Sequence, residues 1–264
     1  VYEARQKGVG RRVAIKVLPQ DLALRSRTVR RFLREAQSMG RLAHTNIVDV
    51  YDVRSRGRLH FFAMQFFEGP PLDRVSAAGP MAIADVVRIG IDVADALAHA
   101  HGRGVLHRDI KPANLLRDGD GVALTDFGLA RPLDEEEAGT MTESGDIVGT
   151  PLYMSPEQIA GDGARIDGRS DVWGLGATLY ELLLQRPPFT GRSAQAILHA
   201  ILHRDPQLLR KQREDVPPDL EAVVLKCLEK DPARRYSGAA ALLEDLRGVR
   251  DGTPVSARPP RFFD

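Results

Sequence analysis

The sequence is poor in cysteine and in any excess of one charge, and it has no long hydrophobic run. Its single cysteine, Cys227, excludes an internal disulfide and fits a reducing compartment. Lys and Arg together number 37 and Asp and Glu 36, a balance that argues against a polybasic nucleic-acid binder or an acidic tail. No apolar run approaches the roughly 20 residues of a membrane helix. We therefore expect no nucleic-acid partner and no membrane segment in this chain.

The composition supports a folded chain with a sizeable core. Hydrophobic residues make up 43% of the 264 residues, a length that allows one or two domains. Residues 11–18 alternate in the manner of a strand and place Lys16 on one face. The other elements expected in this first part are a helix over 27–42 and strands over 46–53 and 59–67. The first part is therefore predicted to be a small sheet-rich lobe with one helix.

The pattern changes near Gly69-Pro70-Pro71, after which helices dominate. Residues 83–104 form a long amphipathic pattern that stops at glycines. Further helices are expected near 170–185, 193–203, 219–229 and 237–249. We predict an N-terminal lobe over 1–67, a helical lobe over 68–250 and a Pro-rich linker, or the start of a juxtamembrane segment, over 251–264. The junction of two lobes is a favoured place for a small-molecule site.

Ionic and amide side chains interrupt the apolar segments between residues 105 and 131. Asp109 and Asn114 lie in one loop, and residues 115–125 read as a hairpin. Because a hairpin brings its ends together, it carries Asp126 back beside Asn114 and Asp109. Carboxylate and amide oxygens are ligands that Mg²⁺ prefers, with substrate phosphates completing its shell. A lone loop aspartate is more often a turn or cap residue, so this interpretation depends on the surrounding motifs.

Several such motifs occur in order along residues 1 to about 250. They are "VAIK" with Lys16, "FLREA" with Glu35, "HRDIKPAN" from His107, "DFG" from Asp126, "GTPLYMSPE", "DVWGLG" and "KDPARRY". Together they resemble the eukaryotic-type Ser/Thr protein kinases, and most of all the bacterial members. The resemblance implies an α+β, two-lobed protein-kinase fold, with a small antiparallel-sheet lobe carrying one helix and a larger, mainly helical lobe.

The resemblance also implies how ATP and its metal would be held. Lys16 would hold the α- and β-phosphates and would be aimed by an ion pair with Glu35. Asn114 and Asp126 would hold Mg²⁺, with Mn²⁺ as an alternative. The residues expected around adenine are Val1, Ala14 and Leu116 on the two sides of the ring, Met64 at the back, and the backbone of Gln65 and Phe67. Ordinary core packing is the competing interpretation for Val1, Ala14 and Leu116.

The catalytic groups implied by the resemblance lie in the "HRDIKPAN" loop. Asp109 would orient the acceptor hydroxyl and take its proton, and Lys111 would steady the γ-phosphoryl group. Lys111 and the "GTPLY" stretch favour Ser and Thr acceptors on protein substrates over Tyr. Outside the site, Asp171 and Trp173 are expected to be structural. We also expect Glu157 and Arg235 to form a buried ion pair.

Residues 129–155 would form a regulatory loop in such a kinase. The candidate phosphorylation sites are Thr142, Ser144 and Thr140, and the candidate phosphate-receiving arginines are Arg31, Arg108 and Arg131. Asp146 could partly occupy that arginine cluster, or could be a solvated carboxylate. Autophosphorylation between two copies of the kinase would supply the modification.

One part of the family pattern is absent from these 264 residues. The glycine-rich loop, whose amides cover the phosphates, would precede Val1, so we expect the chain as given to be a weak kinase. Two alternatives remain: a catalytically weak or silent scaffold of kinase fold, and a small-molecule phosphotransferase of related fold. We expect a cytoplasmic location. Bacterial relatives often continue to a membrane anchor, which the parent of this chain could also carry.

Overall fold

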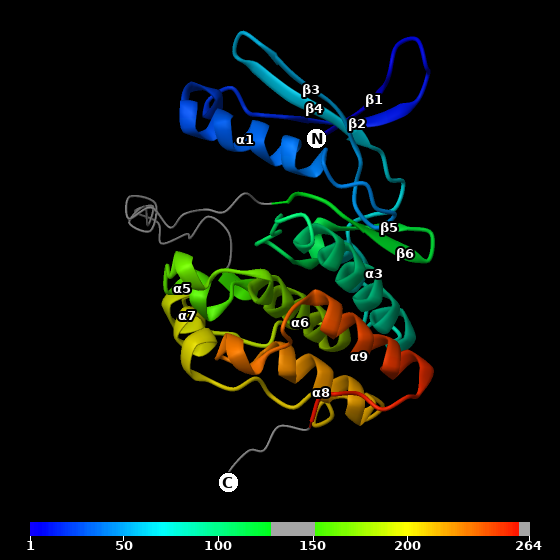
Figure 1. Ribbon diagram of the computed structural model, residues 1–264, viewed down its shortest axis with the longest axis vertical. Helices are drawn as coiled ribbons and strands as arrows, with labels where there is room; N and C mark the ends of the chain where they lie inside the picture. Colours follow the sequence, from blue (N-terminus) through cyan, green and yellow to red (C-terminus); the bar gives the residue numbers. More distant parts are fainter. Residues whose placement is uncertain (128–150, 259–264) are drawn as a thin grey trace.

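The sheet-rich lobe and the helical lobe lie one above the other along the long axis of the molecule (Figure 1). The structure, a computed structural model, describes residues 1–127 and 151–258, apart from the side chain of Arg31. The hairpin formed by β5 (Leu115–Asp118) and β6 (Gly121–Leu124) lies between the two lobes (Figure 1), where it also meets α3 (Ile83–His101). Within the described residues, no helix combines the length and the apolar character of a membrane span.

The N-terminal lobe is built on an antiparallel sheet, as predicted. Its strands are β1 (Tyr2–Arg5), β2 (Arg12–Val17), β3 (Val50–Arg56) and β4 (Leu59–Gln65), in the order β1-β2-β4-β3. Helix α1 (Ser26–Met39) packs on the sheet, with the ring centroids of Phe32 and Phe62 5.1 Å apart. Since Phe32, Ala36 and Met39 recur at helical spacing and are buried, they fix the face that α1 presents.

The predicted strand over 46–53 begins four residues later than expected. Residues before Val50 pair instead with β6 of the other lobe: Ile47 forms a parallel bridge with Leu124, and the N–H of Val48 donates to the Leu124 carbonyl at 3.0 Å. The side-chain amide of Asn46 donates to the Val122 carbonyl at 2.9 Å. This short segment therefore ties the lobes together, which local alternation could not distinguish from an ordinary strand.

The C-terminal lobe contains the predicted helices around one buried helix. Its elements are α2 (Leu72–Ser76), α3 (Ile83–His101), β5 (Leu115–Asp118), β6 (Gly121–Leu124), α5 (Pro156–Ile159), α6 (Gly168–Leu184), α7 (Ala194–His203), α8 (Pro218–Cys227) and α9 (Ala239–Asp251). Helix α6 contacts α3, α8 and α9. A Cβ at Gly176 would lie 2.4 Å from the Cβ of Cys227, so glycine allows α6 and α8 to approach. Burial raises the pKa of the Cys227 thiol, which therefore packs as a neutral side chain.

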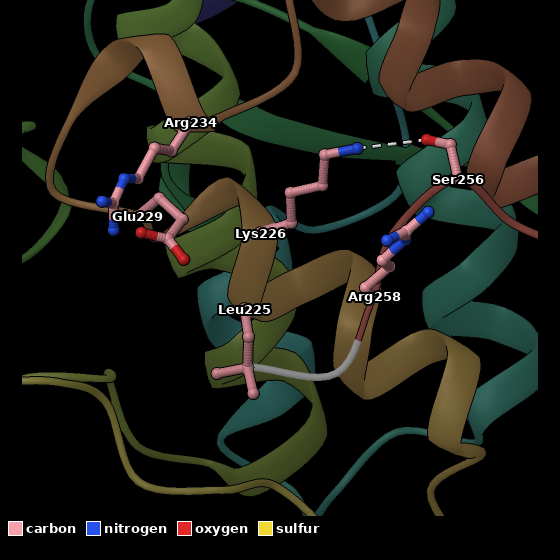
Figure 2. Close-up of a pocket in the computed structure, with 6 residues that line it drawn as sticks. All are labelled: Leu225, Lys226, Glu229, Arg234, Ser256 and Arg258. Carbon is pink, nitrogen blue, oxygen red and sulfur yellow. Dashed lines mark hydrogen bonds between the residues drawn. The ribbon is translucent and has the colours of Figure 1, made fainter. Parts of the chain in front are cut away.

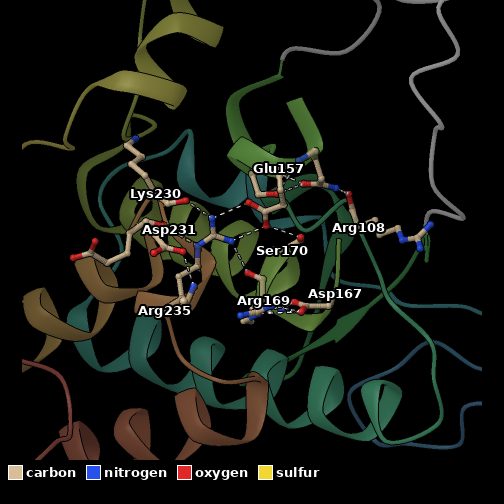
Figure 3. A network of polar contacts seen from close by, with 12 residues as sticks. Arg108, Glu157, Asp167, Arg169, Ser170, Lys230, Asp231 and Arg235 are labelled. Carbon is tan, nitrogen blue, oxygen red and sulfur yellow. Dashed lines mark hydrogen bonds and ion pairs between the residues drawn. The ribbon is translucent and has the colours of Figure 1, made fainter. Parts of the chain in front are cut away.

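The predicted ion pair between Glu157 and Arg235 is confirmed. The two side chains are 3% and 0% exposed, and their contacts of 2.7 and 2.8 Å are bidentate (Figure 3). Ser170 donates to the same carboxylate at 2.6 Å. Burial alone would raise the pKa of Glu157, but Arg235 and Ser170 together lower it below the ordinary value. The pair joins α5 to α6 and to the loop before α9.

The segment that follows α9 remains docked on the lobe as far as it is described. The Asp245 carboxylate accepts from the N–H of Ser256 at 2.8 Å, from its hydroxyl at 2.9 Å and from the N–H of Ala257 at 2.9 Å. Tyr236 donates to the same carboxylate at 2.7 Å. Residues 252–258, which the proline content assigned to a linker, are thus held by α9, and residues 259–264 lie outside the described part of the chain.

Removing one partner of the buried pair should be costly. We expect Arg235→Met to lower the free energy of unfolding by about 3–5 kcal/mol at pH 7, because the Glu157 carboxylate is left buried without a counterion. Urea unfolding would measure this loss. Arg54→Met, which removes the ion pair to Asp52 from a 67% exposed side chain, serves as the control and should cost less than about 1 kcal/mol.

The same variant should show a characteristic pH dependence. In the wild type, the depressed pKa of Glu157 gives stability that is present above the ordinary glutamate pKa of about 4.3 and is lost as pH falls through the folded-state value. In Arg235→Met, burial without a counterion raises that pKa, so protonation at pH 5 should relieve part of the penalty. A penalty that is equal at pH 5 and pH 8 would contradict this account.

Candidate active site

An ammonium group from the sheet meets two carboxylates from different parts of the chain. The Nζ of Lys16 on β2 lies 2.8 Å from Oε1 of Glu35 on α1 and 2.8 Å from Oδ1 of Asp126, which follows β6. The alternation of β2 directs Lys16 to this side, and helix α1 presents Glu35 one turn before its end. The structure therefore brings together three of the predicted residues across the junction of the lobes.

The charges of this triad depend on one another. Burial would lower the pKa of Lys16, but Asp126 and Glu35 outweigh it and raise that pKa above the ordinary lysine value. Burial raises the pKa of Glu35, and the contact with Lys16 only partly offsets this. Lys16 is thus firmly cationic, and its contact is what keeps the Glu35 carboxylate charged.

A second polar group gathers in the loop between α3 and β5. The Nζ of Lys111 donates to Oδ2 of Asp109 at 2.7 Å. The side-chain amide of Asn114 donates to the Asp109 carbonyl at 2.8 Å and to Oδ2 at 3.1 Å. The Asp109 side chain is 48% exposed, so its carboxylate is held in place while remaining open to an incoming molecule.

A buried carboxylate on α6 holds the main chain of this loop. The Asp171 carboxylate on α6 accepts from the N–H of His107 at 2.9 Å and from the N–H of Arg108 at 2.6 Å, and it contacts Nε2 of His101 at 2.8 Å. Arg108 has a φ of +65°, a conformation that a non-glycine residue adopts only when its surroundings impose it. Asp171 supplies that constraint, which agrees with the structural role expected for it.

A neutral histidine joins the loop to the strand end that carries Asp126. The fully buried His107 contacts the Thr125 carbonyl through Nε2 at 2.9 Å, and its Nδ1 accepts from the N–H of Asp109 at 3.2 Å. Burial lowers the pKa of His107, so the ring is neutral with its proton on Nε2. The N–H of Thr125 also donates to the Asn114 carbonyl at 3.0 Å. The predicted hairpin thus places Asp126 beside Asn114.

The oxygen donors of Asn114 and Asp126 suit a magnesium ion. Both hydrogen bonds of the Asn114 side chain use its nitrogen, which leaves Oδ1 as an acceptor. Lys16 contacts Oδ1 of Asp126, and within the described residues Oδ2 has no hydrogen bond. Asp126 has a φ of +58°, which again marks an imposed backbone conformation. No cluster of three or more His, Cys, Asp or Glu side chains in residues 1–127 and 151–258 offers an alternative metal site.

The residues expected around adenine occupy two neighbouring regions. Ala14 and Met64 are buried and directly paired across β2 and β4. Gln65 ends β4, and Leu116 on β5 forms a bridge with Pro71. Phe67 lies between Gln65 and Pro71 in the chain and is partly buried. Val1 precedes β1 and is 75% exposed, so the structure gives it no packed role.

The predicted regulatory residues are described only in part. Arg108 has a buried Nε without a hydrogen-bond partner in the described residues, and its main chain is anchored by Asp171. Arg31 lies in α1 one turn before Glu35, but its side chain lies outside the described part. The remaining residues of this prediction also lie outside it: Arg131, Thr140, Thr142, Ser144 and Asp146.

Sequence reasoning did not single out Gln158, which joins α5 to the loop that carries Arg108 and Asp109. Its Nε2 donates to the Arg108 carbonyl at 2.9 Å, and its Oε1 accepts from the N–H of Ser155 at 2.9 Å. Tyr153 and Glu181, which were also missed, form a 2.6 Å hydrogen bond nearby. The Ser-x-x-Gln spacing is a capping-box signal that could have located Gln158, but not its long-range contact.

Comparisons with known proteins agree with this geometry. The model of the "Protein kinase domain" family matches residues 1–246. The serine/threonine-protein kinase PknB of Mycobacterium leprae is 40% identical over 263 residues, which cover 97% of this chain and 42% of PknB. PrkC of Bacillus subtilis is 37% identical, with 98% of this chain and 39% of PrkC covered. This chain therefore spans about two fifths of the length of these curated relatives.

The solved structures include kinase domains of the same bacterial type. The crystal structure of the Mycobacterium tuberculosis PknI kinase domain superposes with a TM-score of 0.72 at 28% identity, covering 96% of this chain and 90% of that one. The matched family model extends over both lobes and over all the polar groups of the candidate active site. The chain belongs to the protein kinase family and is homologous to bacterial Ser/Thr kinases.

Proposed function

We propose that this chain is the catalytic domain of a protein kinase that transfers the γ-phosphoryl group of ATP to Ser and Thr hydroxyls of proteins. The observation that carries the proposal is the pairing of Lys16 with Glu35 and Asp126, beside the loop that holds Asp109 and Asn114. When bound, ATP with Mg²⁺ would supply the phosphoryl group and the metal charge that offsets its negative oxygens. Asn114 and Asp126 would hold the metal.

Lys16 would bind phosphate oxygens because its charge is secure and its position is fixed. Glu35 holds the ammonium from one side at 2.8 Å, and Asp126 holds it from the other at the same distance. A nucleotide phosphate entering this site would meet a pre-oriented cation, which reduces the ordering needed on binding. Glu35 therefore acts on the nucleotide through Lys16.

Asp109 would orient the acceptor hydroxyl and receive its proton. The carboxylate is partly exposed and is held by Asn114 and Lys111, so an incoming hydroxyl could reach it without rearranging the loop. Lys111 lies 2.7 Å from the same carboxylate and could turn its charge toward the transferred group.

A silent scaffold of the same fold is the main alternative. It is disfavoured because a scaffold has no need of two costly arrangements, the partly buried Lys16 triad and the imposed backbone of Asp126. We place the domain in the cytoplasm, a reducing compartment that its single, buried Cys227 fits. Substrate proteins, and a second copy of the kinase for autophosphorylation, are the partners proposed.

We also propose that phosphorylation of Thr142 or Ser144 regulates the domain. Arg108 supports this because its guanidinium has a donor without a partner in the described residues, while its main chain is fixed by Asp171 and Gln158. A phosphate could satisfy this donor with a charge-assisted hydrogen bond. Thr140 is a further candidate, and Arg31 and Arg131 would complete the phosphate-receiving group.

Removing the proposed base should abolish most of the activity. In the full-length protein, we expect Asp109→Asn to lower the transfer of labelled phosphate from ATP to a generic protein substrate by about 10²–10⁴-fold. Asp52→Asn, which changes an exposed carboxylate on β3, should leave the rate unchanged. A wild type without transfer would favour the scaffold, and transfer to small molecules alone would favour the related phosphotransferases.

The aiming role of Glu35 can be separated from binding. We expect Glu35→Gln to lower kcat by about 10²-fold, because Lys16 would then be held by Asp126 alone and would be displaced from its position. ATP affinity, measured by calorimetry, should change much less than kcat. Glu68→Gln, at an 81% exposed side chain, is the matched control. Equal losses in affinity and kcat would argue against an aiming role.

The regulatory proposal predicts that modification and Arg108 act together. Phosphatase treatment, or Thr142→Ala combined with Ser144→Ala, should reduce activity by about tenfold or more, since a charge-assisted hydrogen bond contributes about 1.5–3 kcal/mol. Arg108→Gln should remove the response to phosphatase, whereas Thr45→Ala at an exposed loop position should not. Mass spectrometry of active protein showing both sites unmodified would contradict the proposal.

A further inference from the structure

A cavity of about 260 Å³ lies far from the candidate active site, between α8 and the segment that follows α9 (Figure 2). Its lining residues are Leu225, Lys226, Glu229, Arg234, Ser256 and Arg258. One water occupies about 30 Å³ of liquid, so the cavity has room for a ligand group larger than a few waters. None of these residues takes part in the proposed phosphoryl transfer.

The cavity carries an excess of positive charge. Three of its lining side chains are cationic, Lys226, Arg234 and Arg258, and only Glu229 is anionic. Within the described part of the chain, none of the three cations forms a salt bridge. Arginines in neighbouring α9 differ, because Arg247 and Arg250 each contact a carboxylate. Within the described residues, the three cationic side chains that line the cavity therefore have no carboxylate as a counterion.

The cation at the centre of the group is already positioned. Lys226 donates to the Ser256 hydroxyl at 3.1 Å, and its Nζ lies 4.1 Å from the centroid of the Tyr236 ring (Figure 2 shows the first contact). Ser256 in turn donates to the buried Asp245 carboxylate. Less side-chain freedom is lost on binding when a cation is held in this way.

We propose that this cavity binds a phosphate group. The Lys226 ammonium and the Arg258 guanidinium lie on the Ser256 side of the cavity (Figure 2), where they could contact phosphate oxygens, and arginine can do so bidentately. Arg234 lies beside Glu229 on the other side and adds its positive charge to the cavity. With three cations against one carboxylate, the cavity has a net positive charge, which attracts a doubly charged phosphate more strongly than a singly charged carboxylate. Glu229 reduces this attraction without reversing it. The phosphate could be free in solution or carried on a phosphorylated protein side chain, since both present the same chemistry to these residues.

Binding there would also steady the point where the chain leaves the helical lobe. Ser256 and Arg258 form one wall of the cavity and belong to the segment that Asp245 holds on α9. A ligand that bridges this wall to Lys226 favours the docked segment. By reciprocal linkage, conditions that release the segment weaken phosphate binding.

Titration of the nucleotide-free protein tests the proposal. Inorganic phosphate and a phosphoserine peptide, with the unphosphorylated peptide as reference, are followed by calorimetry at low ionic strength, where exposed charges are least screened. Arg234→Gln and Arg258→Gln should each weaken binding by about two- to fivefold, as expected for exposed ion pairs. The double variant should weaken it further, and Glu229→Gln should strengthen it. Lys211→Gln removes an exposed cation outside the cavity and should change nothing.

The outcomes separate the source of the phosphate from the existence of the site. Equal affinity for both probes points to free phosphate, and preference for the phosphopeptide points to a modified protein; either supports the site. Hydrogen exchange of residues 253–258 should slow when phosphate is bound. Three results would overturn the proposal. The first is that neither probe shows saturable binding, and the second is that Lys211→Gln weakens binding as much as the cavity variants do. The third is that binding is lost in Lys16→Met but survives in the Arg234→Gln, Arg258→Gln double variant.

Discussion

The candidate active site depends on one buried carboxylate that contacts no substrate. Asp171, 1% exposed on the central helix α6, accepts the main-chain N–H groups of both His107 and Arg108 and contacts His101 of α3. These contacts impose the left-handed backbone at Arg108 and therefore decide where the next residue, Asp109, points. A carboxylate that accepts main-chain donors in a buried setting is strongly held, because leaving either partner unsatisfied there would be costly. The rigidity of the helical lobe is thus transmitted to the proposed base.

The second half of the site is assembled across the lobes rather than within one of them. Lys16 belongs to the sheet and Asp126 to the helical lobe, so their 2.8 Å contact forms only when the lobes are correctly placed. The bridge between Ile47 and Leu124 provides that placement, because it attaches the loop before β3 to the strand that leads into Asp126. The proposed phosphate binding and the lobe arrangement are therefore coupled through β6, and movement at this bridge would separate the Lys16 ammonium from the proposed metal ligands, Asn114 and Asp126.

The sequence was sufficient to predict what repeats along the chain or lies near in it. Periodicity located α3, α6 and α9 closely, and the hairpin argument placed Asp126 next to Asn114, since both depend on local geometry. It failed where distant contacts override local pattern. Residues 46–48 continue the alternation of a strand, yet they pair with β6 instead of extending β3. Likewise, no local signal joins Gln158 to the Arg108 carbonyl 50 residues away.

The contact of Gln158 shows how the proposed acceptor side of the site is tied to the same foundation. Its amide holds the Arg108 carbonyl, while the neighbouring Glu157 is fixed by Arg235 and Ser170. Because Ser170 directly precedes Asp171 on α6, the residue that anchors α5 and the residue that anchors the loop before Asp109 are adjacent on one buried helix. A displacement of α6 would therefore move both together and preserve their relative position. The position of Asp109, the proposed base, relative to α5 is consequently less sensitive to motion of the helical lobe than its position relative to Lys16, which belongs to the other lobe.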